Sequence, residues 1–170
     1  LGLVGSEMCI RDSKRLSIID LSKAGKQPMA LNHLHITYNG EIYNYQELAI
    51  ELFSFGVTSS GLSDTEVLFQ CLIHWGVEKT LPKLDGMFAF GFYDKIKREL
   101  TLARDRIGEK PLYWAYCDER LWFASEIKAL LLIPGFEKQP DFESLHHYMS
   151  LGYIPGKLTA FSGIKELEPG

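Results

Sequence analysis

The sequence is poor in cysteine, in long apolar runs and in basic charge, and each shortage excludes a class of protein. Cys9, Cys71 and Cys117 make an odd count without metal-ligand spacing, which favours a reducing compartment over a disulfide framework. We therefore expect a cytoplasmic protein, with Cys71 as an inert core residue in an apolar helical pattern. No apolar stretch approaches the roughly 20 residues that cross a bilayer, so no membrane partner is expected. A formal net charge of −4 gives no electrostatic case for nucleic acid.

Several motifs of catalysis and metal binding are absent as well. The sequence has no Gly-rich phosphate loop, no zinc pattern and no nucleophile elbow, so no metal site is expected in it. What it does contain is 46% hydrophobic and 24% charged residues, which is ordinary for a globular fold that buries a real core. Its 170 residues suit one domain, or one domain with part of a second.

The hydrophobic pattern predicts short strands in runs, with helices between them. Strands are expected at 15–21, 35–38, 86–94, 100–105, 112–117 and 121–124, and residues 1–5 could form another. Helices are expected at 45–52, 64–75, 126–132 and 144–149, with Ser63 and Asp141 as N-caps. Residues 152–170 are rich in Gly and Pro and are expected to be a linker without helix or strand. Because several strands are joined as hairpins, the pattern favours an α+β fold with antiparallel sheet and outer helices.

One polar stretch, Asn39-Gly40-Glu41, follows a predicted strand and precedes a predicted helix. Binding and catalytic groups favour such junctions, because the scaffold there is rigid. Asn39 offers a carboxamide donor and Gly40 permits close backbone approach, so the two could form an oxyanion site. By itself, however, Asn-Gly is also the strongest short hairpin signal, and a plain turn is the alternative interpretation.

Three charged residues at the edges of elements have the chemistry to bind an α-amino acid. Arg15 could grip a carboxylate in bidentate fashion, and Glu41 and Asp64 could receive an ammonium group. Three separate surface ion pairs are an equally good interpretation of these residues. In the segment Arg104 to Tyr113, charges of both signs accompany a Gly-x-x-Pro spacing, which indicates a specified loop shape rather than a solvated hairpin turn.

Seven motifs in order resemble the glutaminase domain of the asparagine synthetase B family, whose members are class II glutamine amidotransferases. They are RLSIIDLS, QPM, YNGEIYN, SDTEVL, LDGMFAF, ARDRIGEKPLYW and FASEIKAL. The similarity runs from Arg15 to the last residue. It implies an α+β fold of the N-terminal-nucleophile hydrolase type, a four-layer αββα sandwich with two stacked antiparallel sheets, which we expect to be truncated at its N-terminus.

The resemblance also implies an activity and a set of site residues. Glutamine is hydrolysed, and its ammonia passes to the protein's own synthetase domain, where ATP and Mg²⁺ serve the amidation of aspartate. No cofactor is implied for the glutaminase domain, and a homodimer is expected only of the full-length protein. Asn39 and Gly40 would form the oxyanion hole. The implied substrate-binding residues are Arg15, Ile18, Ile19, Glu41 and Asp64.

The first thirteen residues depart from the family pattern. The family begins with a nucleophilic N-terminal Cys followed by Gly, whereas Cys9 is followed by Ile10 and lies six residues before Arg15. We therefore expect residues 1–13 to be of foreign origin, 14–135 to be a partial amidotransferase domain, and 136–170 to be the linker and the start of a missing synthetase domain. A chain without its nucleophile is expected to be inactive as a glutaminase.

Two other functions stay open. A related amidotransferase could aminate another acceptor, in a polysaccharide or secondary-metabolite pathway. A non-catalytic member could serve as a glutamine-binding or scaffold domain. The complete amino-acid pocket implied by Arg15, Asn39, Gly40, Glu41 and Asp64 argues against a scaffold.

Overall fold

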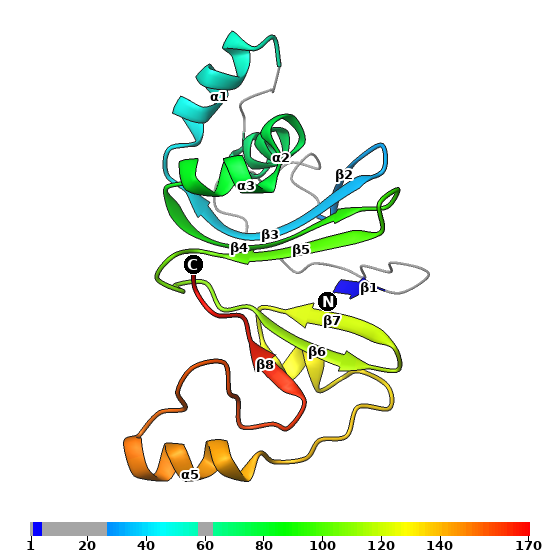
Figure 1. Cartoon of the computed structure of the whole chain (residues 1–170), viewed down its shortest axis with the longest axis vertical. Coiled ribbons are helices and arrows are strands. Elements are labelled where there is room, and N and C mark those ends of the chain that lie inside the picture. Colours follow the sequence, from blue (N-terminus) through cyan, green and yellow to red (C-terminus); the bar gives the residue numbers. More distant parts are fainter. Residues whose placement is uncertain (1, 5–26, 58–62) are drawn as a thin grey trace. The chain divides into compact units, whose positions relative to one another are not determined.

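The computed structural model describes residues 2–4, 27–57 and 63–170 (Figure 1). These residues form two compact units, one of residues 27–101 and one of residues 2–4 with 102–170. Two four-stranded sheets are present, with strand orders β2-β3-β4-β5 and β1-β7-β6-β8. Every strand pair with a described register is antiparallel. The predicted α+β class with antiparallel sheets is therefore confirmed.

The first sheet carries its helices on one face (Figure 1). Its strands are β2 (Met29–Leu31), β3 (Leu34–Ile42), β4 (Gly86–Asp94) and β5 (Glu99–Arg104). The helices are α1 (Tyr45–Ser54), α2 (Asp64–Trp75) and α3 (Val77–Thr80), and a 3₁₀ turn, η2 (Leu81–Lys83), follows them. The strand predicted at 15–21 lies outside the described residues.

The core of this unit lies between β3 and β4 and the helices. On β3, every second residue is buried: Ile36, Tyr38 and Ile42 are between 0 and 4% exposed. This alternation is what one buried strand face requires. Opposite them, α2 contributes fully buried residues such as Val67 and Leu68. The core therefore fixes which side chains of β3 point to the helices.

Helix α2 begins and ends where its sequence predicts. The hydroxyl of Ser63 accepts a hydrogen bond from the Glu66 N–H at 3.2 Å, which satisfies one of the first backbone donors of the helix. Gly76, with a φ of +79°, ends it. Within the helix, Cys71 is fully buried, and burial raises the pKa of its thiol to about 12. The expectation that Cys71 is a core residue is confirmed.

The second unit has its own sheet and core. Its strands are β1 (Gly2–Val4), β6 (Tyr113–Cys117), β7 (Arg120–Ala124) and β8 (Ile164–Glu166). The helix α4 (Ile127–Leu130) packs on β6 and β7, whereas α5 (Phe142–Leu151) buries only Ser144. One cluster of buried core residues consists of Ala115, Ala124, Leu130, Ile133 and Ile164.

Several predicted bounds and segments differ from the structure. The strand expected to end at Tyr38 continues to Ile42, because β4 pairs with it as far as Gly86. The helix expected at 126–132 is shortened to Ile127–Leu130. The tail expected to lack strands contains β8, which pairs with β6. For β3 and β8, pairing with a distant strand overrides a local signal.

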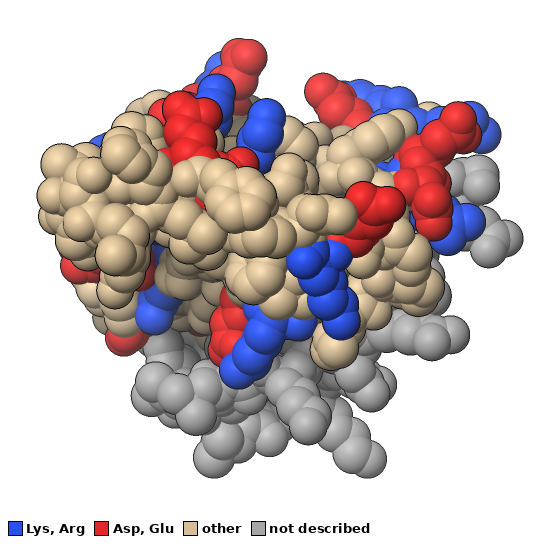
Figure 2. Space-filling view, turned by 90° about the horizontal axis from the view of Figure 1, so that it is seen from below, with Lys and Arg blue, Asp and Glu red and all other residues tan. Residues whose placement is uncertain are grey.

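None of the helices in the described part of the chain combines the length and the apolar character that a membrane crossing requires. On the face shown in Figure 2, acidic and basic side chains are interspersed among uncharged ones. That view contains no wide area of one charge sign among the described residues.

Candidate functional site

Along one edge of β3, backbone N–H groups donate to the side chains of Gln27 and Asp64 instead of to a neighbouring strand. The Tyr38 N–H donates to Oε1 of Gln27 at 2.7 Å, and the Ile42 N–H donates to Oδ2 of Asp64 at 3.2 Å. In an antiparallel pair, the backbone N–H groups of successive residues point to opposite edges, so those of every second residue share an edge. The Tyr43 N–H accordingly points the other way and donates to the carbonyl oxygen of Asp85 at 2.7 Å.

The same alternation places the Gly40 N–H on the edge with Gln27 and Asp64. Gly40 lies two residues from Tyr38 and two from Ile42, a spacing of roughly 7 Å along the strand in each direction. Its N–H therefore faces the interval between the two side chains. A backbone N–H can donate to an oxygen atom that develops negative charge, which is the role predicted for Gly40.

Gly40 also leaves no room for a side chain beside β4. A Cβ at this position would lie 2.2 Å from the Met87 carbonyl oxygen and 2.7 Å from the Phe88 Cα. Gly86 has the reciprocal contact, because its Cβ would lie 2.2 Å from the carbonyl oxygen of Glu41. The interpretation of Asn39-Gly40 as a hairpin turn is thereby excluded, since both residues lie within a paired strand. The glycine is required by strand packing rather than by a turn.

Asp64 is a fully buried carboxylate at the first position of α2. Its Oδ2 accepts hydrogen bonds from the Tyr38 hydroxyl at 2.6 Å and from the Ile42 N–H, and its Oδ1 accepts one from the Thr65 N–H at 2.8 Å. The helix N-terminus favours a negative charge there. No basic side chain of the described residues forms an ion pair with Asp64.

Asn39 and Glu41 lie on the other face of β3 from Tyr38 and Ile42. Asn39 is exposed and Glu41 is half-buried. The strand thus places Asn39, Gly40 and Glu41 in sequence, and the hydrogen bond from Ile42 brings Asp64 against the end of this segment. Their proposed roles stay predictions. The other predicted site residues, Arg15, Ile18 and Ile19, lie outside the described residues, as does Cys9.

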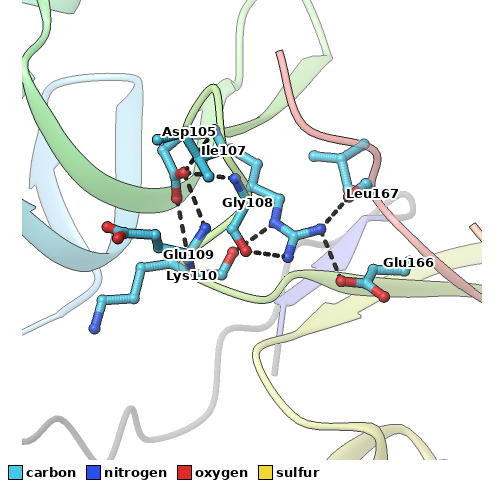
Figure 3. A network of polar contacts seen from close by, with 8 residues as sticks. Asp105, Ile107, Gly108, Glu109, Lys110, Glu166 and Leu167 are labelled. Carbon is cyan, nitrogen blue, oxygen red and sulfur yellow. Dashed lines mark hydrogen bonds and ion pairs between the residues drawn. The ribbon is translucent and has the colours of Figure 1, made fainter. Parts of the chain in front are cut away.

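The loop that follows β5 has a specified shape, as the Gly-x-x-Pro spacing predicts (Figure 3). The Asp105 carboxylate accepts hydrogen bonds from four backbone N–H groups of the loop, at 2.6 to 3.1 Å. These belong to Ile107, Gly108, Glu109 and Lys110. One buried side chain therefore organises the whole turn.

Arg104 ties this loop to the C-terminal segment, where Figure 3 labels its partners Glu166 and Leu167. Its guanidinium donates to the carbonyl oxygens of Lys110 at 2.7 Å, Gly108 at 2.6 Å and Leu167 at 2.7 Å. It also pairs with Glu166 at 2.7 Å, and its side chain is only 7% exposed. These contacts of Arg104 are structural, because they fix the loop between β5 and β6 against β8.

Sequence reasoning did not single out Gln27 or Tyr38 as site residues. Gln27 belongs to the QPM motif and Tyr38 to the YNGEIYN motif, but neither motif assigns them a role. Tyr38 follows the apolar alternation of a buried strand, so its pattern predicts a core residue. Only the tertiary structure shows that its hydroxyl reaches Asp64, 26 positions further along the chain.

Comparison with known proteins agrees with the predicted family. The model of a glutamine amidotransferase domain matches residues 2–170. The chain belongs to the glutamine amidotransferase domain family. Asparagine synthetase [glutamine-hydrolyzing] 1 of Bacillus subtilis is 42% identical to this amidotransferase domain over 92% of the chain and 25% of that relative. Amidase chry2 of Gibberella zeae is 35% identical over 92% of the chain and 23% of that relative.

Solved structures support the fold of the amidotransferase domain. Glutamine phosphoribosylpyrophosphate amidotransferase from B. subtilis matches with a TM-score of 0.57 and 24% identity, over 66% of this chain and 27% of that one. The predicted fold of the N-terminal-nucleophile hydrolase type is confirmed. The chain spans about a quarter of the length of the asparagine synthetases that it matches.

Proposed function

We propose that this chain is the glutaminase part of a glutamine-hydrolysing asparagine synthetase. In the whole protein, this part would bind glutamine and release its side-chain amide as ammonia, which would serve the ATP-dependent amidation of aspartate elsewhere in the same protein. The observation that carries the proposal is the edge of β3. There the Gly40 N–H faces the interval between Gln27 and a buried carboxylate, Asp64, that pairs with no basic side chain of the described residues.

The chemistry of glutamine fits these groups. Attack of a thiolate on the side-chain carboxamide converts its carbonyl oxygen into an oxyanion, which the Gly40 N–H and the Asn39 carboxamide would stabilise. Collapse of this tetrahedral intermediate expels ammonia and leaves a thioester, which water then hydrolyses to glutamate. Asp64 and Glu41 would hold the α-ammonium group, and Arg15 would hold the α-carboxylate.

Assembly with a synthetase domain is part of the same proposal. ATP and Mg²⁺ would bind in that domain and not in this one. The helix α5 supports an interface of this kind, because Phe142 is 77% exposed and Met149 is 83% exposed, and large apolar side chains gathered on one exposed helix are typical of contact surfaces. A cytoplasmic location also belongs to the proposal and rests on the reducing compartment that the cysteine count favours.

The test separates binding from turnover. Titration calorimetry with L-glutamine should detect binding by the 170-residue chain, whereas a coupled assay should detect no ammonia release above the blank. Cys9→Ala should change neither result, because Cys9 lacks the sequence context of the family nucleophile. Ammonia release that is abolished by Cys9→Ala would show that Cys9 is the nucleophile. Absence of glutamine binding would overturn the proposed function and favour a scaffold.

An amidotransferase with a different acceptor is the second candidate. The similarity to Amidase chry2 favours keeping it, since a protein of another name carries a domain 35% identical to this one. Both candidates predict glutamine binding at the β3 edge. They differ only in the acceptor, so product analysis of the whole protein with aspartate and ATP distinguishes them.

A further inference from the structure

Two of the hydrogen bonds of Tyr38 fix the residue at both ends. Its backbone N–H donates to Gln27 Oε1 at 2.7 Å, and its hydroxyl donates to Asp64 Oδ2 at 2.6 Å. The side chain is 4% exposed, and Gln27 is 6% exposed. A buried ring with both of its ends bonded has little rotational freedom, so the position of its hydroxyl is determined by the sheet.

The Asp64 carboxylate has a nearly complete set of donors. A carboxylate offers about four acceptor positions, two on each oxygen. On Oδ2 both are used, by the Tyr38 hydroxyl and the Ile42 N–H. On Oδ1 the Thr65 N–H takes one at 2.8 Å, and the Thr65 hydroxyl is at the limit of hydrogen bonding, at 3.5 Å. Among the described residues, one position on Oδ1 therefore receives no donor.

We infer that Tyr38 is a positioning residue for substrate binding: its hydroxyl holds the Asp64 carboxylate so that Oδ1 is presented to the α-ammonium group of glutamine. This inference rests on the proposed function, because it needs a ligand that carries an ammonium group. Without the hydroxyl, Oδ2 keeps only the Ile42 N–H, and the carboxylate can turn away from the geometry that the ligand requires. Preorganisation of this kind reduces the cost of ordering the site when the ligand binds.

The experiment compares two ligands that differ only in the amino group, L-glutamine and 4-carbamoylbutanoate. Their dissociation constants are measured by calorimetry for the wild-type chain, Tyr38→Phe and Asp64→Asn. Tyr38→Phe keeps the ring and its packing. It should weaken L-glutamine binding by about tenfold, the typical size for a hydrogen bond to a charged group, and should leave 4-carbamoylbutanoate binding unchanged. Asp64→Asn should weaken L-glutamine binding more strongly than Tyr38→Phe does, and it should also leave 4-carbamoylbutanoate binding unchanged.

Tyr93→Phe is the matched control, since Tyr93 is a buried tyrosine of β4 whose ring lies 6.5 Å from that of His35. It should bind both ligands as the wild type does. Equal L-glutamine binding by wild type and Tyr38→Phe would overturn the role of Tyr38 alone. An equal loss for both ligands would also overturn it, because that result indicates a general structural effect. Failure of the wild-type chain to bind L-glutamine would overturn the proposed function together with this inference.

Discussion

At the scale of single residues, two glycines decide how closely the strands of the site approach each other. Gly40 on β3 lies against the backbone of Met87, and Gly86 on β4 lies against the backbone of Glu41. Each would place a Cβ at 2.2 Å from a carbonyl oxygen, a distance that no side chain tolerates. The backbone of the candidate oxyanion donor is thus held by a mutual steric requirement of two strands.

Replacing either glycine should separate the strands. We expect Gly40→Ala and Gly86→Ala each to lower the free energy of unfolding by about 2–3 kcal/mol, since backbone atoms must move. Urea denaturation followed by circular dichroism measures this. Gly56→Ala is the control, because Gly56 has a φ of +77° but nothing within 4 Å of its Cβ position. A loss in Gly40→Ala no larger than in the control would contradict the steric explanation.

At the scale of elements, the loop between β5 and β6 is organised by one acidic side chain and bound to β8 by one basic side chain. Asp105 is 3% exposed and accepts four backbone hydrogen bonds. Arg104 connects the same loop to Glu166 and Leu167. The short strand β8 therefore depends on contacts with a segment about 60 residues away in the chain, as well as on its pairing with β6.

Asp105→Ala should lower the free energy of unfolding by roughly 3 kcal/mol, because four backbone N–H groups lose a charged acceptor. Hydrogen exchange should then show faster exchange of the amides of the loop. Glu109→Ala, at an exposed position of the same loop, should change stability by less than about 0.5 kcal/mol. If both variants behaved alike, Asp105 would not be the organising side chain.

At the scale of the whole molecule, each unit contains a carboxylate that caps a turn or a helix. Hydrogen bonds from the backbone N–H groups of Lys97 and then Ile96 hold the pKa of Asp94 below its ordinary value of 3.8. The Ser144 backbone N–H, followed by its side chain, does the same for the pKa of Asp141. A lowered pKa in the folded state means stability that is present above the unfolded pKa and lost on acidification through the folded pKa.

Thermal unfolding measured from about pH 5 down to about pH 2 should reveal both groups. Asp94→Asn and Asp141→Asn keep a side-chain acceptor but cannot titrate, so each should reduce the loss of stability on acidification. Because the two carboxylates lie in different units and share no partner, the effects should add in the double variant. Unchanged acid sensitivity in the double variant would exclude these two caps as its source.

The sequence by itself determined the elements whose signals are local. Helix α2 has Ser63 before it and Gly76 after it, and its predicted bounds, Asp64–Trp75, are those observed. The nearly continuous apolar run of β4 predicts Gly86–Asp94 equally well. Seven ordered motifs also determined the family, because each depends only on residues close together in the chain.

Only the tertiary structure decided where β3 ends, that the tail contains β8, and which groups surround Asp64. The polar residues Asn39 and Glu41 predict the end of a strand, yet pairing with β4 carries β3 to Ile42. The hydroxyl of Tyr38 meets Asp64 across 26 residues of chain. Such contacts follow from register and helix packing, and these depend on the free energy of the whole fold rather than on any local preference.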